Sequence, residues 1–295
     1  MKIFNALLAG LASTFRVWKG VLIMWFFSLL LVSMLAIPLK GSLRSVFGKS
    51  MITEIFSEGL NIEILPDMGS SLNTILSSFS SGFFFMILAG FLMNVFLSGG
   101  LFGSIRDGSV RFSSSSFFRS AAYYFRSFLV IMLIISVIMI FLILLVMIVP
   151  IVIVSTSDSV TEKGFFNTLI ISGAVTGIFM LMLLLVADFA RAWQISNVSP
   201  AGFRALAFGF RQSFRYFLSS FFFMMILIIV QVLFIFFVFK FLSTWRPING
   251  GGIFLLFLVS QFLFFIKIML RTWRYAGVTE LMEQSFKIQN INPII

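Results

Sequence analysis

The sequence predicts an all-α membrane protein in which six transmembrane helices form a single domain over residues 1–295, and three observations support this. First, 60% of the 295 residues are hydrophobic and 11% are charged, which is more apolar surface than a soluble core can bury. Second, six charge-free windows are long enough to cross about 30 Å of hydrocarbon as helices. Third, similar basic segments precede three of these windows. The windows are Gly20–Leu39, Met68–Ile105, Ser127–Ser157, Gly164–Ala187, Tyr216–Phe239 and Pro247–Ile266.

The chain starts with an interfacial segment of mixed apolar and basic residues, positions 4–17, which leads into the first window. Lys2 followed by apolar residues also resembles a signal peptide, but Arg16 and Lys19 interrupt that apolar run. The first window lacks a small-x-small cleavage site and is long enough to span the membrane. We therefore expect an uncleaved first helix.

Residues 40–80 are expected to form the one long loop, on the extracytoplasmic side. Its apolar residues recur at loosely helical spacing until Pro66, which predicts one or two short helices lying on the outer leaflet. Such a segment is either a lid or partner-binding cap, or a long connection that hides its apolar side in the interface.

The second helix is expected at about 82–101, and the second basic lead-in at 104–126. A third helix follows from about Phe128, and Pro150 should kink or end it near its outer end. A short polar connection at 154–166 precedes the fourth helix, which ends at about Ala187.

The third lead-in covers residues 188–215 and precedes the last two helices. These are joined by the tight turn Arg246–Gly252, in which one proline and three glycines favour a chain reversal. The remaining segment, 272–295, is expected to be a short cytoplasmic tail.

The lead-ins contain a repeated nine-residue pattern. Phe118–Arg126 and Phe203–Arg211 share Phe, Arg, Ala, Phe and Arg at matched places, and Leu8–Arg16 is a fainter third copy. Each copy precedes an apolar window, which predicts three parallel hairpin repeats, each opened by an amphipathic lead-in helix. The predicted units are about 4–103, 104–187 and 188–271.

Charge placement predicts the orientation. The net charge is +11, and with six spans most of the Lys and Arg residues fall on the side of the two termini. The positive-inside rule places that side in the cytoplasm. We therefore expect a multi-pass protein of the bacterial inner membrane with both termini cytoplasmic.

Two absences exclude much chemistry. The chain contains no Cys and no His, which removes thiolate nucleophiles and the commonest metal ligand and general base. No span has a charged residue at its centre, which argues against a proton relay or a voltage sensor. We assign no catalytic, cofactor-binding or metal-binding residue, and we expect no cofactor and no enzymatic activity.

The lead-in arginines are candidates for contact with lipid phosphate, because guanidinium groups beside aromatic rings suit the headgroup boundary. They either anchor the helices or form a specific anionic-lipid site on the cytoplasmic leaflet. Binding to nucleic acid is not expected, since no soluble basic domain presents them. These residues are Arg16, Arg119, Arg126, Arg204, Arg211 and Arg215.

Three amides inside the windows, Asn94, Gln231 and Gln261, are candidates for bonds between helices or for contact with a solute. Asp188 and Arg191, three residues apart near the inner end of the fourth helix, are expected to form an interfacial ion pair. The pattern Gly173–Gly177 would let another helix approach closely, as is common in membrane helices.

Asp188–Arg191, with the sequence Asp-Phe-Ala-Arg, is followed by the Phe-Arg-rich segment Phe203–Arg211. This succession is similar to that in uncharacterised bacterial six-helix proteins which resemble the membrane domain of glycerophosphodiester phosphodiesterases. The resemblance implies a six-helix membrane fold. It implies no catalysis, because the phosphodiesterase catalytic domain is absent from this sequence.

Two functions fit these observations. The first is a non-enzymatic scaffold, assembly or accessory subunit of a membrane complex, in contact with anionic lipid and with other membrane-protein subunits. The alternative is a permease for a neutral or lipid-like solute that passes between hairpins lined by the three amides.

Overall fold

The computed structural model describes residues 2–47, 69–108, 112–156, 161–198, 201–215, 217–245 and 249–291. Within these ranges the chain is helical and has no strands, as the composition predicts. The chain divides into two compact units. One is Ile23–Asn94, and the larger one combines Met1–Leu22 with Val95–Ile295.

The first lead-in is a separate helix, α1 (Lys2–Arg16), and α2 (Trp18–Phe47) follows after a break at Val17. The two helices are bent by 67° at this break. The carbonyl of Val17 accepts from the amide of Gly20 at 2.8 Å and from that of Val21 at 3.3 Å, so it stays hydrogen-bonded at the break.

The smaller unit contains the rest of α2 and the first part of α4 (Gly69–Asp107). In α2, the hydroxyls of Ser28 and Ser33 donate to carbonyls four residues earlier, which satisfies them inside an apolar helix. The loop expected at 40–80 is shorter, since α2 continues to Phe47 and α4 begins at Gly69. Its central part lies outside the described residues.

Residues 114–126 of the second lead-in form one continuous helical run with the third span, which differs from the expected separate lead-in helix. Ser113 caps α5 (Ser114–Leu142), and a π-helix, η3 (Ile143–Ile148), joins it to α6 (Val149–Ser155). Pro150 lies in the first turn of α6, just after η3. Because proline cannot donate a backbone hydrogen bond and crowds the preceding turn, the helix changes its winding before Pro150 and then continues.

The remaining helices are α7 (Glu162–Ser196), α8 (Gly202–Arg215), α9 (Phe217–Thr244) and α10 (Gly250–Ile291). Thr161 caps α7 by accepting the amide of Gly164 at 3.3 Å. In the segment 272–295, expected to be the cytoplasmic tail, α10 continues without a break as far as Ile291.

Five of the described helices are long and apolar enough to cross a membrane, and a sixth span exists if the bent pair of α1 and α2 counts as one. The protein is therefore an α-helical, multi-pass membrane protein. Where the chain is described, the six predicted windows lie within these helices except at Thr156 and Asn249, which lie just outside a helix end.

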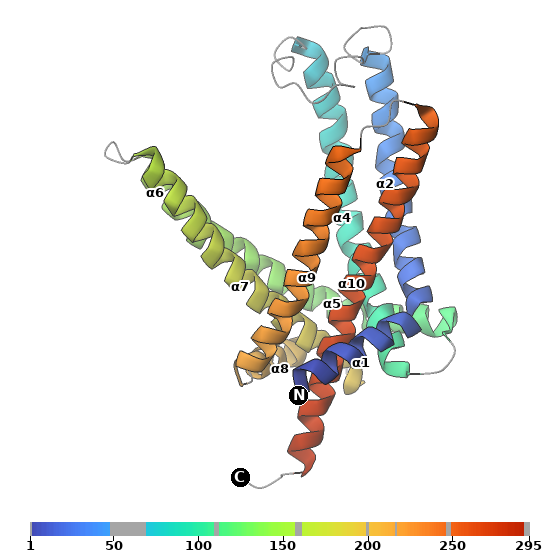
Figure 1. Cartoon of the computed structure of the whole chain (residues 1–295), viewed down its shortest axis with the longest axis vertical. Coiled ribbons are helices and arrows are strands. Elements are labelled where there is room, and N and C mark those ends of the chain that lie inside the picture. The colour runs from blue at the N-terminus through green and yellow to red at the C-terminus, as the bar shows by residue number, and fades with distance from the viewer. Residues whose placement is uncertain are drawn as a thin grey trace. The chain divides into compact units, whose positions relative to one another are not determined.

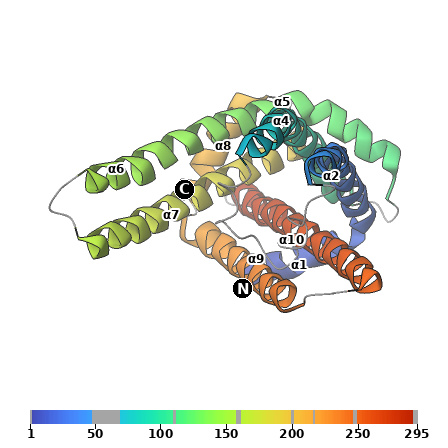
Figure 2. The same cartoon turned by 90° about the horizontal axis from the view of Figure 1, so that it is seen from above.

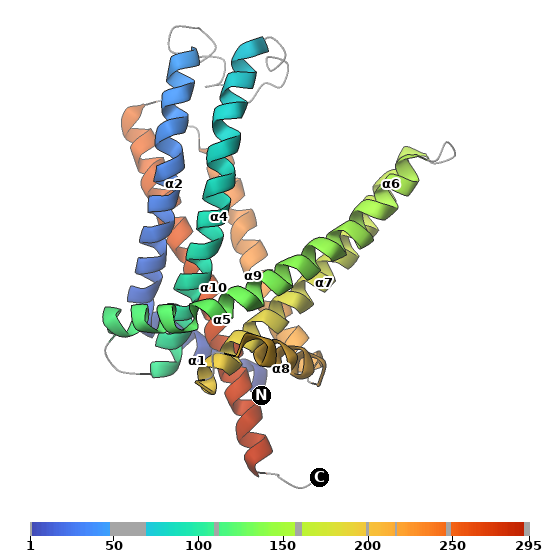
Figure 3. The same cartoon turned by 180° about the vertical axis from the view of Figure 1, so that it is seen from behind.

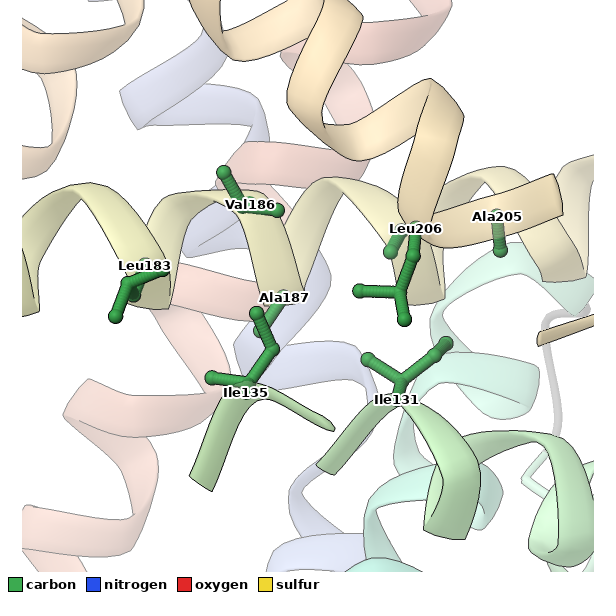
Figure 4. Close-up of a cluster of buried hydrophobic side chains, with 8 residues drawn as sticks. Ile131, Ile135, Leu183, Val186, Ala187, Ala205 and Leu206 are labelled. Carbon is green, nitrogen blue, oxygen red and sulfur yellow. The ribbon is translucent and has the colours of Figure 1, made fainter. Parts of the chain in front are cut away.

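The core of the larger unit gathers where α5, α7 and α8 meet (Figure 4). Ile131 and Ile135 of α5 approach Val186 and Ala187 of α7, and Leu206 of α8 covers the same cluster. Small residues let these helices pack closely. A Cβ added to Gly209 of α8 would lie 2.5 Å from the carbonyl oxygen of Val186.

The three lead-in segments share one burial pattern. In each nine-residue copy the seventh residue is buried, and so is the residue that directly follows the whole copy. The first, fifth and ninth residues of each copy are exposed. Two of the exposed positions, the fifth and the ninth, carry the Ala and the Arg that all three copies share. The buried ones are Thr14, Tyr124 and Gly209, and then Val17, Ser127 and Gln212.

Each lead-in packs on another helix of the larger unit (Figure 1). α1 crosses α10 so closely that a Cβ added to Gly10 would lie 2.8 Å from the Cα of Gly277. The start of α5 lies on the end of α4, where a Cβ added to Gly103 would lie 2.5 Å from the Cβ of Ser120. α8 packs on α7. We call this end of the larger unit the junction end, and the opposite end of its spans the far end.

Toward the far end the helices of the larger unit separate. α6 lies beside α7 (Figure 2), and this pair diverges from α9 and α10 (Figures 1 and 3). No residue of η3 or α6 is buried, and the buried residues of α9 end at Leu227. The packing of this unit is therefore concentrated at the junction end.

Candidate functional site: a buried arginine–aspartate junction

Three charged side chains meet inside the junction end. Asp188 and Arg191 come from α7, and Arg274 comes from α10, 83 residues or more away along the chain. All three are buried: the side chain of Asp188 is 0% exposed, that of Arg191 3% and that of Arg274 8%. We call these three residues the charged junction.

The carboxylate of Asp188 joins both arginines. Nη1 of Arg191 donates to Oδ1 at 3.0 Å, which is the ion pair expected between these residues, although it is buried rather than surface-exposed. Nε of Arg274 lies 2.9 Å from Oδ2. This second contact has ion-pair distance, but its N–H is not aligned as a hydrogen bond. The junction therefore links α7 to α10 mainly through charge.

Aromatic rings enclose the charged groups. The guanidinium of Arg274 lies 5.3 Å from the ring centroid of Tyr275, and that of Arg191 lies 6.0 Å from the ring of Phe128. Tyr275 stacks on Phe102 of α4 with centroids 4.6 Å apart. Its hydroxyl accepts a 2.7 Å hydrogen bond from Nε of Arg271. Cation–π contacts offset part of the loss of hydration that burial imposes on the arginines.

Polar contacts surround the junction and join further elements to it. Gln194 of α7 donates to the hydroxyl of Ser127 in α5, and Arg106 of α4 donates to the carbonyl of Ile195. The second bond satisfies one of the carbonyls that a helix leaves free at its C-terminus. On the other side, Trp273 Nε1 donates to the carbonyl of Leu7 in α1 at 2.8 Å.

The charge of the junction is unbalanced, because two guanidinium groups share one carboxylate. In addition, Nε of Arg191 is buried and has no hydrogen-bond partner among the described residues. Removing the carboxylate would leave two buried cations without a counter-charge. The link between α7 and α10 at the junction therefore depends on a single carboxylate.

The lead-in arginines expected to contact lipid all lie on exposed positions of the larger unit. Arg16 donates weakly, at 3.5 Å, to the hydroxyl of Ser13 and to the carbonyl of Ile105 at the end of α4. They therefore remain outside the charged junction. Besides Arg16, the lead-in arginines are Arg119, Arg126, Arg204, Arg211 and Arg215.

Two of the three candidate amides, Gln231 and Gln261, belong to the larger unit. Nε2 of Gln231 is buried without a hydrogen-bond partner in the described part of the chain, so it makes no bond to Gln261. Oδ1 of Asn94, which belongs to the smaller unit, is likewise buried and without a partner there.

Sequence reasoning missed Arg274, Tyr275, Gln194 and Ser127. The helical spacing of Tyr275, Val278 and Met282, all buried on α10, could have shown that the last helix continues beyond its apolar window. Nothing in the local sequence indicates that Asp188 pairs with a residue of another helix. That contact depends on how the hairpins pack.

Comparisons with protein-family models, with curated proteins and with solved structures find no match to this chain. The similarity to the membrane domain of glycerophosphodiester phosphodiesterases therefore stays a prediction.

Proposed function

We propose that this protein is a non-enzymatic accessory or scaffold subunit of a membrane complex, which binds the membrane helices of a partner protein with its far end. The observation that carries the proposal is the uneven packing of its spans. Of the most apolar 18-residue window in α10, 6% is buried, and of the corresponding window in the run from Ser114 to Ser155, 11%. The helices of the larger unit pack together at the junction end and lie apart at the far end. This arrangement leaves long helix faces available to a partner protein.

The small-residue face of α7 is the best place for such a partner. A Cβ added to Gly173 or Gly177 would meet nothing within 4 Å, whereas the glycines at the junction end are in close contact. Association of helices in lipid depends on close backbone approach, which small residues four apart allow. Ile170 and Ile178 flank this face and are 67% and 49% exposed.

Contact with anionic lipid is the second part of the proposal. The exposed side of each lead-in combines an arginine at its ninth position with an apolar residue at its first, as in Phe203 and Arg211 of α8. This combination suits the boundary between phosphate and acyl chains. We further propose that the lead-ins lie on the cytoplasmic face of the bacterial inner membrane, because of the positive-inside rule.

The proposed partner contact can be tested by photo-crosslinking in native membranes. A crosslinking amino acid at Ile170, beside the open glycines, is expected to capture one membrane protein of defined mass. The same amino acid at Phe166, also exposed on α7, maps how far the contact extends. The variant Gly173→Leu, Gly177→Leu should abolish capture at Ile170, while Gly250→Leu, at a glycine with equally open surroundings, should not.

Capture of lipid alone at Ile170 would refute the proposal, and so would capture that persists in the double glycine variant. Comparable yields of purified, folded protein for all variants would exclude a general loss of folding as the cause.

A second candidate function, a permease for a neutral or lipid-like solute, is favoured by one observation. The amide nitrogen of Gln231 is buried in an apolar helix without a hydrogen-bond partner among the described residues, and such groups are costly in lipid. A solute would supply the partner. Saturable uptake into proteoliposomes that is lost in Gln231→Leu would support this candidate, and uptake equal to that of empty liposomes would refute it.

A further inference from the structure

The turn between the last two spans contains an asparagine that directly precedes a glycine. Asn249 is followed by Gly250, Gly251 and Gly252, and it is the one asparagine of the sequence with a glycine after it. Both Asn249 and Gly250 are exposed. We call these two residues the Asn–Gly pair.

The Asn–Gly pair lies where the chain enters α10. The carbonyl of Asn249 accepts from the amide of Ile253 at 3.0 Å, so Asn249 occupies the N-cap position and Gly250 is the first helical residue. The N–H of Gly250 therefore belongs to the first turn, whose amides have no acceptor inside the helix. Within the described ranges the side-chain amide of Asn249 has no hydrogen-bond partner either.

Open space surrounds the pair. A Cβ added to Gly250 or to Gly251 would meet nothing within 4 Å. Glycine itself has no Cβ that would keep its backbone nitrogen away from the preceding side chain. The covalent chain already holds this nitrogen close to Cγ of Asn249, and such proximity makes an intramolecular attack far faster than attack by a separate molecule.

We propose that the Asn–Gly pair is a site of spontaneous deamidation, with water as its co-reactant. A base removes the proton from the N–H of Gly250, and the nitrogen attacks Cγ of Asn249. The new C–N bond closes a succinimide ring, while the bond from Cγ to the side-chain nitrogen breaks and that nitrogen takes up a proton and leaves as ammonia. Water then adds to one of the ring carbonyls and opens the ring. The product at this position is aspartate or isoaspartate.

The two products affect the start of α10 differently. Aspartate keeps the main chain unchanged and places a negative charge at the helix N-terminus, where the helix dipole favours it. In isoaspartate the main chain passes through the former side chain, and the carbonyl that accepts from Ile253 becomes a free carboxylate. Deamidation therefore adds a negative charge at the far end, and its isoaspartate form also loosens the first turn of α10. The site does not depend on the partner protein proposed above.

Peptide mass spectrometry of the purified full-length protein, incubated in detergent, tests the assignment. We expect both products to accumulate at Asn249, and to accumulate faster as the pH rises, because a base must remove the N–H proton. An isoaspartyl methyltransferase with a labelled methyl donor identifies the isoaspartate. Asn167, which is exposed on α7 and precedes Thr168, is the internal reference. It should stay unmodified, since a β-branched residue inside a helix hinders the approach of its nitrogen.

Two neighbouring glycines provide matched variants. Gly250→Ala adds a methyl group beside the attacking nitrogen and should slow the conversion of Asn249 several-fold, whereas Gly251→Ala should leave its rate unchanged. Both added Cβ atoms have open surroundings, so a loss of folding would not distinguish the two variants. Equal rates in the two variants would overturn the proposal, as would an Asn249 that is converted no faster than Asn167.

Discussion

The substitution Asp188→Asn tests the charged junction most severely, because it removes the one carboxylate that two buried arginines share. Oδ1 lies 3.0 Å from Nη1 of Arg191, and Oδ2 lies 2.9 Å from Nε of Arg274. An asparagine keeps the size of the side chain but leaves both guanidinium groups without a counter-charge. The cost of breaking a buried ion pair in this way is about 3–5 kcal/mol.

Removing one arginine should cost less than removing the carboxylate. In Arg274→Gln the pair between Asp188 and Arg191 remains, so we expect a loss of about 1–3 kcal/mol, the cost of leaving a buried polar atom without its partner. The neutral triple variant Asp188→Asn, Arg191→Gln, Arg274→Gln leaves no unpaired charge. It should therefore be more stable than Asp188→Asn alone.

The assay is reversible unfolding by SDS in mixed micelles, followed by the fluorescence of the five tryptophans. The expected order of stability is native, then Arg274→Gln, then Asp188→Asn. If Asp188→Asn unfolded at the same SDS fraction as the native protein, the buried carboxylate would not hold the junction together. If the triple variant were the least stable of all, hydrogen bonding rather than charge balance would explain the cluster.

Three further predictions follow from the packing and the topology. Gly209→Ala should lose about 1–3 kcal/mol, because its Cβ would lie 2.5 Å from the carbonyl oxygen of Val186, whereas Gly173→Ala should be neutral or slightly stabilising; equal effects in the same SDS assay would contradict this. Trp273→Phe should speed hydrogen exchange in α1, because it removes the 2.8 Å bond to Leu7, worth about 1 kcal/mol; unchanged exchange would show that α1 is held without it. Because the chain has no native Cys, single cysteines can report the orientation of the protein in cells with a permeable outer membrane. A cysteine at Asn249 should react with an impermeant thiol reagent, and a cysteine at Ala207 should react only after the inner membrane is opened. The reverse pattern would place the lead-ins on the outer side.

The helical class and the membrane spans could be predicted because they depend on local composition. A run of apolar residues without charge specifies a spanning helix whatever lies beside it. Boundaries were less accurate, since the helices continue beyond their apolar windows. α10 is the clearest case: Tyr275, Val278 and Met282 are buried after its window ends, so packing against neighbouring helices replaces lipid as the apolar environment.

The repeated residues of the lead-ins indicated where each segment lies, but not how it packs. Ala12, Ala122 and Ala207 recur at the fifth position and are exposed, whereas the seventh position varies between Thr, Tyr and Gly and is buried. Each buried position matches a different neighbour, so its side chain varies with the surface opposite. The similarity between the copies therefore identifies exposed positions of the lead-ins. Their packing contacts could be seen only in the structure.

Of the two ion pairs in the charged junction, one could be predicted from the sequence. Asp188 and Arg191 are three residues apart on one helix, and this spacing alone indicates a pair. Arg274 comes from α10, and its approach depends on the crossing of α7 and α10.

The most direct test of the proposed function is to extract the protein from its native membrane in lipid particles and to measure the mass of the intact assembly. If it is an accessory or scaffold subunit, the assembly should contain a second membrane protein at fixed stoichiometry, and that protein should be lost in the variant Gly173→Leu, Gly177→Leu. Particles that contain this chain with lipid alone would contradict the account, as would a partner retained in the double variant.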